Sequence, residues 1–234
     1  MQKEIKIFGK TVALNMRNDG DYVIANELFL DHQYRYCDTV IKNAKQAVID
    51  IGGHLGFFSL YASLLNPTVP IYSFEPHIGN FEMLKINLQQ NRVRNVTAKN
   101  LAVSNQIGEV ELLLSKEDLN HSIVRAIEPT NEVQKVQTIT LEKILDRHHI
   151  GHCDLIKIDC EGAEFSILED SPPAIFDRVS HIFLEYHDWA APYGGQVPNG
   201  DHRRLKKFLE ARGFKVEKYP NSKMKELGFF WCYK

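Results

Sequence analysis

Apolar runs of two kinds alternate along the chain, and their spacing predicts the order of strands and helices. Short runs rich in branched and aromatic residues, bounded by glycine, proline or polar residues, are typical of buried strands; apolar positions three and four apart indicate one face of a helix. The ranges expected to form strands are 46–52, 70–76, 95–104, 108–115, 132–140, 153–159, 179–187, 214–220 and 227–234. The ranges expected to form helices are 21–36, 55–65, 78–91, 140–148, 163–170 and 201–213.

The start of the chain follows a different pattern from the rest. Residues 3–16 alternate between apolar and polar positions around Gly9 and Lys10, which predicts a β-hairpin. Further along, strands alternate with helices, and this order predicts an α/β fold with a doubly wound, mostly parallel sheet and an antiparallel closing strand. We therefore expect a single domain, 1–234, in which 1–45 form a hairpin and helix extension and 46–234 form the core.

Acidic residues stand at the carboxyl ends of three expected strands: Asp50, Glu75 and Asp159. In doubly wound sheets, ligands bind beyond these ends, where the strand order reverses. The three carboxylates are therefore expected near one ligand site.

Glycines follow the first of these acids in the run "VIDIGGHLGFF". Gly52, Gly53 and Gly56 allow a tight turn and a close approach of a ligand to bare backbone, just before a helix start that favours anionic groups. The dinucleotide motif G-x-G-x-x-G does not fit, because His54 occupies the place of its second glycine. A strand-to-helix turn without any ligand is the alternative explanation for these glycines.

The acid after the next strand strengthens the ligand hypothesis. Glu75 lies 25 residues after Asp50, and an acid about 20 residues beyond such a turn holds the ribose in nucleotide-binding folds. A solvated cap is an equally simple reading of Glu75 alone. Together with the glycine turn, it indicates a ligand that contains adenosine.

The stretch "LIKIDCEGAEFSIL" places carboxylates just past a buried strand. Asp159 and Glu161 could hold a cation, take a proton, or only begin a solvated helix. We expect both to face the pocket, and we expect Glu164, on the following helix, to be structural or solvated.

A second polar group follows the strand 179–187 in the run "FLEYHDW". Glu185 and His187 share one face of the strand, so with Asp159 they could form a base or a metal-binding pocket. A structural capping role for His187 is the alternative. The loop that starts at Tyr193 could cover a substrate or be an ordinary surface loop.

Composition limits the classes of function. The net charge of −2 gives no support to a broad nucleic-acid-binding surface. No charged start followed by an apolar run and no membrane-spanning segment is present in the sequence, and we expect a cytoplasmic protein. The four cysteines have no paired spacing, so reduced thiols are expected at Cys37, Cys153, Cys160 and Cys232.

Two further features are set aside. The segment "RHHIGHCD" holds His148, His149, His152 and Cys153 but lacks the paired spacing of a zinc site and is expected at the opposite edge of the sheet. The basic residues of 201–213 fall on the polar face of an expected amphipathic helix, where a solvated face explains them.

Five stretches carry a family resemblance: "VIDIGGHLGFFSL", "YSFEPHIGNFEMLKINL", "NLAVSN", "VQTITLEKIL" and "LIKIDCEGAEFSIL". In this order and spacing they resemble the FkbM family of S-adenosylmethionine-dependent methyltransferases. The most specific element is K-I-D-x-E-G-x-E at 157–164. The resemblance implies a Rossmann-like seven-strand methyltransferase fold and, usually, methylation of a hydroxyl on a small molecule or sugar.

The resemblance also implies roles for residues. Asp50, Gly52 and Gly56 would line the methionine part of the cofactor, Glu75 would hold the ribose, and Ala102 and Val103 would flank the adenine. Expected to bind cofactor are Asp50, Gly52, Gly53, His54, Gly56, Glu75, Pro76, Asn100, Ala102, Val103 and Asp159. The chain departs from the family at Gly53-His54, where Ala-Asn is usual, so His54 is expected to replace an amide near the amino-acid end of the cofactor.

The expected chemistry is in-line methyl transfer, in which the enzyme aligns the acceptor about 3–3.5 Å from the methyl group. A general base would add about 10²–10⁴ in rate, and the candidate catalytic residues are Asp159, Glu161, Glu185 and His187. A divalent metal could assist, but no metal ligand is assigned. The partner is expected to be a small-molecule or sugar acceptor, without nucleic acid or membrane. The alternatives are an RNA base methyltransferase and a non-catalytic cofactor-binding module.

Overall fold

A seven-stranded sheet forms the centre of the protein. The computed structural model describes residues 1–116, 121–124, 129–188, 201–221 and 227–234. In spatial order the strands are β11 (Lys215–Pro220), β12 (Leu227–Tyr233), β10 (His181–His187), β9 (Leu155–Ile158), β3 (Val48–Ile51), β4 (Ile71–Phe74) and β5 (Val96–Lys99). Six of these seven strands run in the same direction, and β12, which is antiparallel to both β10 and β11, runs in the opposite direction. The predicted fold class, with its antiparallel closing strand, is confirmed.

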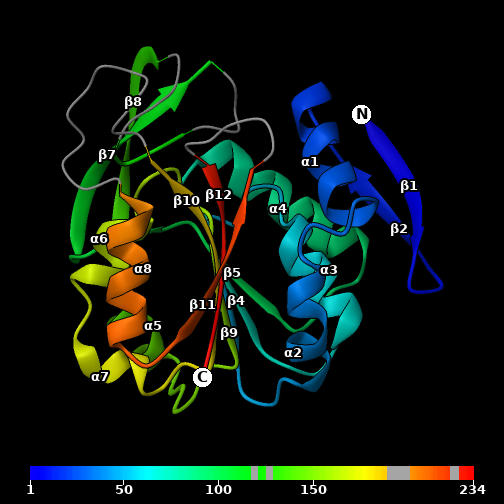
Figure 1. The fold of residues 1–234 in the computed structure, drawn as a ribbon. Helices are drawn as coiled ribbons and strands as arrows, with labels where there is room; N and C mark the ends of the chain where they lie inside the picture. The colour runs from blue at the N-terminus through cyan, green and yellow to red at the C-terminus, as the bar shows by residue number, and fades with distance from the viewer. Residues whose placement is uncertain (117–120, 125–128, 189–200, 222–226) are drawn as a thin grey trace.

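Helices cover both faces of this sheet (Figure 1). One face carries α1 (Asp19–Phe29), α2 (Asp38–Asn43), α3 (Phe57–Leu65) and α4 (Ile78–Gln90). The other face carries α5 (Leu141–Arg147), α6 (Glu164–Glu169), α7 (Pro173–Phe176) and α8 (His202–Ala211). None of the helices in the described part of the chain combines the length and apolarity that a bilayer crossing requires.

The two central strands alternate between the two cores. Val48 of β3 and Leu155 of β9 pack into the core on the α3 side, whereas Ile49 and Ile156 pack into the core on the α5 side. Burial on both faces explains why these strands read as continuous apolar runs. By the same alternation, residues 50 and 157 point toward α3.

The N-terminal hairpin is confirmed, with β1 (Gln2–Ile7) paired to β2 (Lys10–Asn15). It is held to α4 because the Asn15 amide donates to Asn87 Oδ1 at 2.7 Å. The helix predicted over 21–36 is too long, since α1 ends at Phe29. His32 has φ +51°, a left-handed conformation that no helix can contain, and a 3₁₀ turn, Arg35–Cys37, follows.

The strand predicted over 95–104 is divided between two sheets. It breaks at Asn100, whose side chain donates to the carbonyls of Glu75 (2.9 Å) and Pro76 (2.7 Å). After this break a three-stranded sheet forms from β6 (Ala102–Val103), β7 (Gly108–Ser115) and β8 (Pro129–Ile139). Pairing between segments this far apart is not visible in local periodicity.

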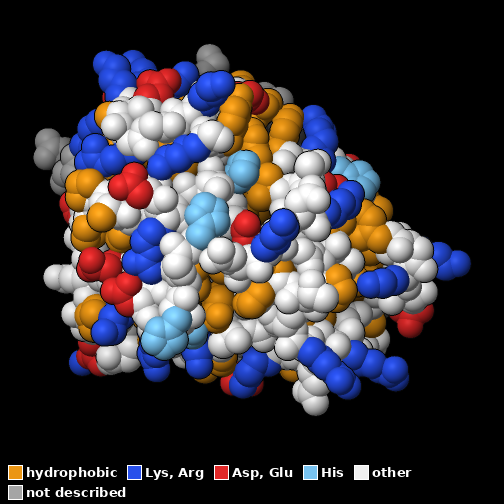
Figure 2. Space-filling model, turned by 90° about the horizontal axis from the view of Figure 1, so that it is seen from below, with side chains coloured by type: hydrophobic (Ala, Val, Ile, Leu, Met, Phe, Trp, Pro, Cys, Tyr) orange, Lys and Arg blue, Asp and Glu red, His pale blue; other side chains and the backbone are white. Residues whose placement is uncertain are grey.

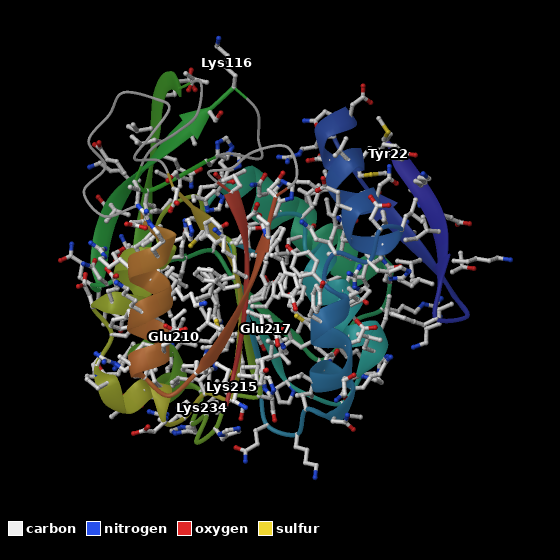
Figure 3. The ribbon with its side chains drawn as sticks, viewed as in Figure 1. Tyr22, Lys116, Glu210, Lys215, Glu217 and Lys234 are labelled. Atoms are coloured by element: carbon white, nitrogen blue, oxygen red, sulfur yellow. The ribbon has the colours of Figure 1, made fainter. Side chains whose placement is uncertain are left out.

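The free edge of the main sheet, β11, carries charged residues. Lys215 and Glu217, labelled in Figure 3, lie on this strand, and Glu217 accepts a hydrogen bond from the Tyr233 hydroxyl at 3.1 Å. Charged side chains on an edge strand oppose pairing with another chain.

Candidate active site

A cavity of about 510 Å³ opens at the carboxyl ends of β3, β4, β9 and β10, which is where ligands bind in doubly wound sheets. Of the residues expected to bind cofactor, those on its wall are Gly52, Gly53, His54, Glu75, Pro76, Ala102, Val103 and Asp159. Glu161, Glu185 and His187, expected to be catalytic, also line it. Asp50, Gly56 and Asn100 are not among the lining residues, so the structure departs from the expected set at these three positions.

The glycine turn is shaped by contacts within the protein. Gly52 has φ +78°, and a side chain there would overlap the carbonyl oxygen of Asp159. Gly56 has φ +80°, and a Cβ atom would lie 2.9 Å from Leu84 Cγ. The amides of Gly52 and Gly53 both donate to the Phe74 carbonyl, at 3.0 and 2.9 Å. The glycines of this turn are therefore required by close packing of the chain on itself, while Gly52 and Gly53 still line the cavity.

Glu75 is buried at the end of β4 and is held by several donors. Its Oε2 accepts from the His54 amide at 2.7 Å, and its Oε1 accepts from the His77 amide at 2.8 Å. The Asn80 side chain adds a longer bond of 3.4 Å. Burial raises the pKa of Glu75 to about 7, even though the two backbone donors oppose that change.

The cavity wall beside Glu75 is apolar. Ala102 and Val103 of β6 are buried there, and Leu112 and Ile123 line the same wall. Asn100, expected to bind cofactor, instead braces the loop that presents Glu75 and Pro76. A wall of this kind fits the face of a flat aromatic ring.

His54 lies on the wall with φ +46°. Its Nε2 is 3.3 Å from Arg17 Nη2 and 3.6 Å from Asp21 Oδ1. Burial lowers the pKa of His54 to about 4, although Asp21 opposes this. The side chain thus connects the glycine turn to the N-terminal segment, a contact that no local motif reveals.

Asp50 lies behind the cavity wall, because it points toward α3. Its Oδ2 accepts from the Ser59 hydroxyl at 2.7 Å and the Ser73 hydroxyl at 3.1 Å, and its Oδ1 lies 3.4 Å from Lys157 Nζ. Lys157 also donates to the Gly52 carbonyl at 2.8 Å and lies 3.8 Å from Asp159 Oδ2. Asp50 therefore supports Lys157, which lines the cavity, and a contact of Asp50 with cofactor stays a prediction.

At the other end of the cavity, β9 and β10 bring acidic residues together with one imidazole. We call Asp159, Glu161, Glu185 and His187 the acidic end. His187 Nε2 lies 3.5 Å from Glu161 Oε2, and Glu161 has φ +53°. Among the described residues, no hydrogen bond reaches the carboxylate of Glu185.

Glu164 was expected to be either structural or solvated. It is fully buried, which agrees with the structural alternative. Its Oε1 accepts from both the amide and Nδ1 of His187, each at 2.9 Å. Its Oε2 accepts from the Gly162 amide at 2.9 Å. Glu164 therefore ties the loop after β9 to the end of β10 and orients the His187 ring.

Crowding of carboxylates shifts the protonation equilibria of the acidic end. Burial raises the pKa of Glu161 to about 7, with Asp159 and Glu164 adding to the effect and His187 opposing it. Burial and the Asp159 charge raise the pKa of Glu185 well above its usual range. Burial alone would lower the pKa of His187, but Glu161 and Glu164 hold it well above its usual value.

The N-terminal segment supplies part of the wall that the sequence did not reveal. These residues are Ile24, Glu27, Leu28, Gln33 and Tyr34. Tyr34 is only 8% exposed, and among the described residues its hydroxyl has no hydrogen-bond partner. Burial, followed by the charges of Asp159 and Glu185, raises the pKa of Tyr34. Tyr34 falls inside the range 21–36 expected to form one helix, so its direction depends on the end of α1 at Phe29, which the sequence pattern did not predict.

The side chains of the histidine-rich segment are engaged separately and are not among the described groups that could hold a metal ion. His148 packs on Tyr72 with ring centroids 4.2 Å apart, His152 Nε2 lies 2.7 Å from the Ser180 hydroxyl, and Cys153 is buried. The lower face of the molecule shows several histidine side chains, with Lys and Arg side chains scattered across it (Figure 2). Trp189 and residues 193–200 of the expected covering loop lie outside the described residues.

Comparisons with known proteins agree with this arrangement. A sequence model of a family, described as Methyltransferase FkbM domain, matches residues 50–216. Methyltransferase 1 of Beauveria bassiana (strain ARSEF 2860) is 25% identical over 213 residues, which cover 82% of this chain and 80% of that protein. The 31-O-demethyl-FK506 methyltransferase FkbM of Streptomyces tacrolimicus is 24% identical over 210 residues, with 77% and 79% covered.

A solved structure supports the fold. The precorrin-6y C5,15-methyltransferase of Geobacter metallireducens GS-15 aligns with a TM-score of 0.50 at 17% identity, covering 89% of this chain and 90% of that one. This likeness concerns the arrangement of strands and helices alone.

Proposed function

We propose, from the premise that the chain belongs to the FkbM family of S-adenosylmethionine-dependent methyltransferases, that it methylates a hydroxyl group of a small molecule or sugar. The observation that carries this proposal is the division of one cavity into two unlike ends. One end offers Glu75 beside an apolar wall, and the other offers carboxylates beside His187. A cofactor site and an acceptor site in contact are what methyl transfer requires.

The residues of the first end fit S-adenosylmethionine. Glu75 would accept hydrogen bonds from the ribose hydroxyls, and the wall of Ala102 and Val103 would pack against the adenine. Gly52 and His54 would face the methionine part. When bound, the cofactor supplies a methyl group on a positively charged sulfur.

At the second end the chain would align the acceptor and take its proton. In its ionised form Glu185 has the better geometry for a base, because its carboxylate lines the cavity and no described residue donates a hydrogen bond to it. Its raised pKa makes that form the stronger base and shifts it to higher pH. The bound cofactor would supply the methyl carbon to the acceptor oxygen and would keep the electron pair of its C–S bond on sulfur. Glu185 would take the acceptor proton. A base in this position contributes about 10²–10⁴ in rate.

Specificity for oxygen is supported by one relative and by the chemistry of the acidic end. The name of the Streptomyces tacrolimicus protein describes methyl transfer to 31-O-demethyl-FK506. Carboxylates that can accept a hydroxyl proton suit the same reaction on this chain.

The test has two stages. Calorimetric titration with S-adenosylmethionine should give one site per chain; absence of binding contradicts the proposal. Labelled cofactor with a metabolite extract should then yield an alkali-stable methyl ether on a small molecule. Label on RNA would favour RNA methylation, and binding without any transfer would favour a non-catalytic module.

A further inference from the structure

The acidic end holds more carboxylates than the nearby cations can neutralise. Asp159, Glu161 and Glu185 line the cavity there. Lys157 already faces Asp50 at 3.4 Å and donates to the Gly52 carbonyl, so its charge is shared with another carboxylate. Partly buried carboxylates without matching cations are costly, and a positively charged ligand would relieve this cost.

Three side chains of the acidic end bring together atoms that could coordinate one metal ion. One oxygen each of Asp159 and Glu161 and one ring nitrogen of His187 lie within 4.8 Å of one another. Two atoms that each lie about 2.1 Å from one ion are at most ~4.2 Å apart. A small movement of the three side chains toward one another would therefore allow all three to coordinate the same ion. Carboxylate oxygens with one imidazole suit divalent ions such as Mn²⁺.

Glu164 orients the imidazole as a metal ligand requires. It accepts from His187 Nδ1 at 2.9 Å, and this leaves Nε2 directed to Glu161 at 3.5 Å. In metal sites, a histidine ligand almost always donates its other ring N–H to a carboxylate, carbonyl or water. Glu164 is fully buried, so this orientation is imposed by the fold.

An independent group points to a ligand at the same place. The Tyr34 hydroxyl, on a side chain that is 8% exposed, faces this cavity without a hydrogen-bond partner among the described residues. Asp159 and Glu185 are the charged groups that act on it most strongly. The Tyr34 hydroxyl oxygen is not one of the fully enclosed polar atoms, so it is accessible from the cavity, and a ligand oxygen at the acidic end would give it a hydrogen-bond partner.

We propose that Asp159, Glu161 and His187 bind one divalent cation in the acceptor half of the cavity, with the acceptor hydroxyl as a further ligand. The assignment of the acceptor to this half rests on the proposed function. The cation would hold the hydroxyl in place and make it more acidic, so that Glu185 removes its proton more readily. Tyr34 would donate a hydrogen bond to an oxygen bound at this site.

A second acid and histidine group offers a control within the chain. Asp188, Asp201 and His202 also lie within 4.8 Å of one another. Both ring nitrogens of His202 are already occupied, Nδ1 by Asp188 and Nε2 by Lys218 at 2.6 Å. This second group is therefore the poorer site.

The experiment is a titration of the whole chain with Mn²⁺, followed by the loss of the electron paramagnetic resonance signal of free Mn²⁺. We expect one ion per chain. Glu161→Gln should weaken binding by more than about tenfold, and Glu164→Gln, which disturbs the orientation of His187 without removing a proposed ligand, by about 10–100-fold. His202→Gln is the matched control and should bind Mn²⁺ like the natural chain.

Three outcomes would overturn the cation site: no Mn²⁺ binding, full binding in Glu161→Gln, or loss of binding in His202→Gln. Thermal unfolding of each variant verifies that it is folded. Calorimetry with S-adenosylmethionine on the same samples separates the two proposals. Cofactor binding without Mn²⁺ binding contradicts the cation site alone, whereas absence of cofactor binding contradicts the proposed function.

Discussion

The two ends of the cavity differ in how completely their polar groups are paired within the protein. At the cofactor end, Glu75 accepts from two backbone amides and the Asn80 side chain, and Asn100 braces the adjoining loop. At the acidic end, the Glu185 carboxylate and the Tyr34 hydroxyl have no hydrogen-bond partner among the described residues.

This difference indicates two modes of ligand recognition. A carboxylate held by backbone donors keeps one position, so the cofactor end is organised before the ligand arrives. Groups without hydrogen-bond partners in the protein gain most of their hydrogen bonds from the ligand. Ligand binding should therefore change the hydrogen bonding of the acidic end more than that of the cofactor end. Substitutions at the two ends should therefore affect different measured quantities.

The largest effect is expected for Glu185→Gln. The substitution removes the proposed base and should lower kcat by about 10²–10⁴-fold, while the affinity for S-adenosylmethionine changes little. Single-turnover methyl transfer and calorimetry measure the two quantities separately. Glu169→Gln, which removes a carboxylate paired with Arg204, serves as the control and should keep its turnover. Full turnover in Glu185→Gln would assign the base elsewhere.

Asp50→Ala should act on stability rather than on direct cofactor contact. It leaves Lys157, only 3% exposed, without its nearest carboxylate. Breaking a buried ion pair costs about 3–5 kcal/mol of unfolding free energy, whereas replacing both partners by apolar residues is often tolerated. Urea unfolding should therefore show a large loss in Asp50→Ala and partial recovery in Asp50→Ala with Lys157→Met. Natural stability in the single variant would contradict the supporting role of Asp50.

Glu75→Gln should weaken S-adenosylmethionine binding. Loss of a charged hydrogen-bond acceptor costs about 1.5–3 kcal/mol, or roughly 10–150-fold in affinity. Because the pKa of Glu75 is about 7, cofactor affinity of the natural chain should fall as pH decreases from 8 to 6. Calorimetry across this range should show a much smaller slope in Glu75→Gln, and equal slopes would remove Glu75 from the ribose site.

The carboxyl group of Glu75 should affect the free energy of unfolding with a pH dependence opposite to that of cofactor affinity. Its pKa is raised from the ordinary 4.5 to about 7, so the folded state favours the protonated form. This contribution to stability is fully present below pH 4.5 and is lost as pH rises through 7. Unfolding free energies from pH 4.5 to 8 should decline less in Glu75→Gln than in the natural chain.

The smallest effect is expected for His54→Asn. Asparagine tolerates the positive φ of this position and restores the amide that is usual in the family. Cofactor affinity should change less than about tenfold, since the principal contacts of His54 are to Arg17 and Asp21. With a pKa of about 4, His54 stays neutral, so the substitution should not alter the pH dependence of binding between pH 5.5 and 8. A steeper change in this range would indicate direct contact with the cofactor.

Local pattern was sufficient to predict most of the sheet, because its inner strands are buried on both faces and so read as apolar runs. It also located the acids at the strand ends. Alternation along β3 is sufficient in principle to place Asp50 on the α3 side of the sheet. A lysine within a buried strand signals an ion pair, and Lys157 in the neighbouring strand β9 is the partner of Asp50.

Other features depend on contacts between distant segments. Gly52 must be glycine because β9 passes beside β3 and brings the Asp159 carbonyl against it, 107 positions later in the chain. Tyr34 reaches the cavity only because α1 ends at Phe29. Neither fact can be obtained from periodicity within a window of residues.

The position of β12 has a consequence for how the chain folds during synthesis. This strand lies between β10 and β11, so β11 has no neighbour in the sheet, and β10 has only β9, until residues Leu227–Tyr233 have left the ribosome. Until then β10, which carries Glu185 and His187, presents an unpaired edge of mainly apolar residues. Such an edge can pair with other chains. Nascent chains stalled before Leu227 should therefore be captured by chaperones more readily than chains released after Tyr233.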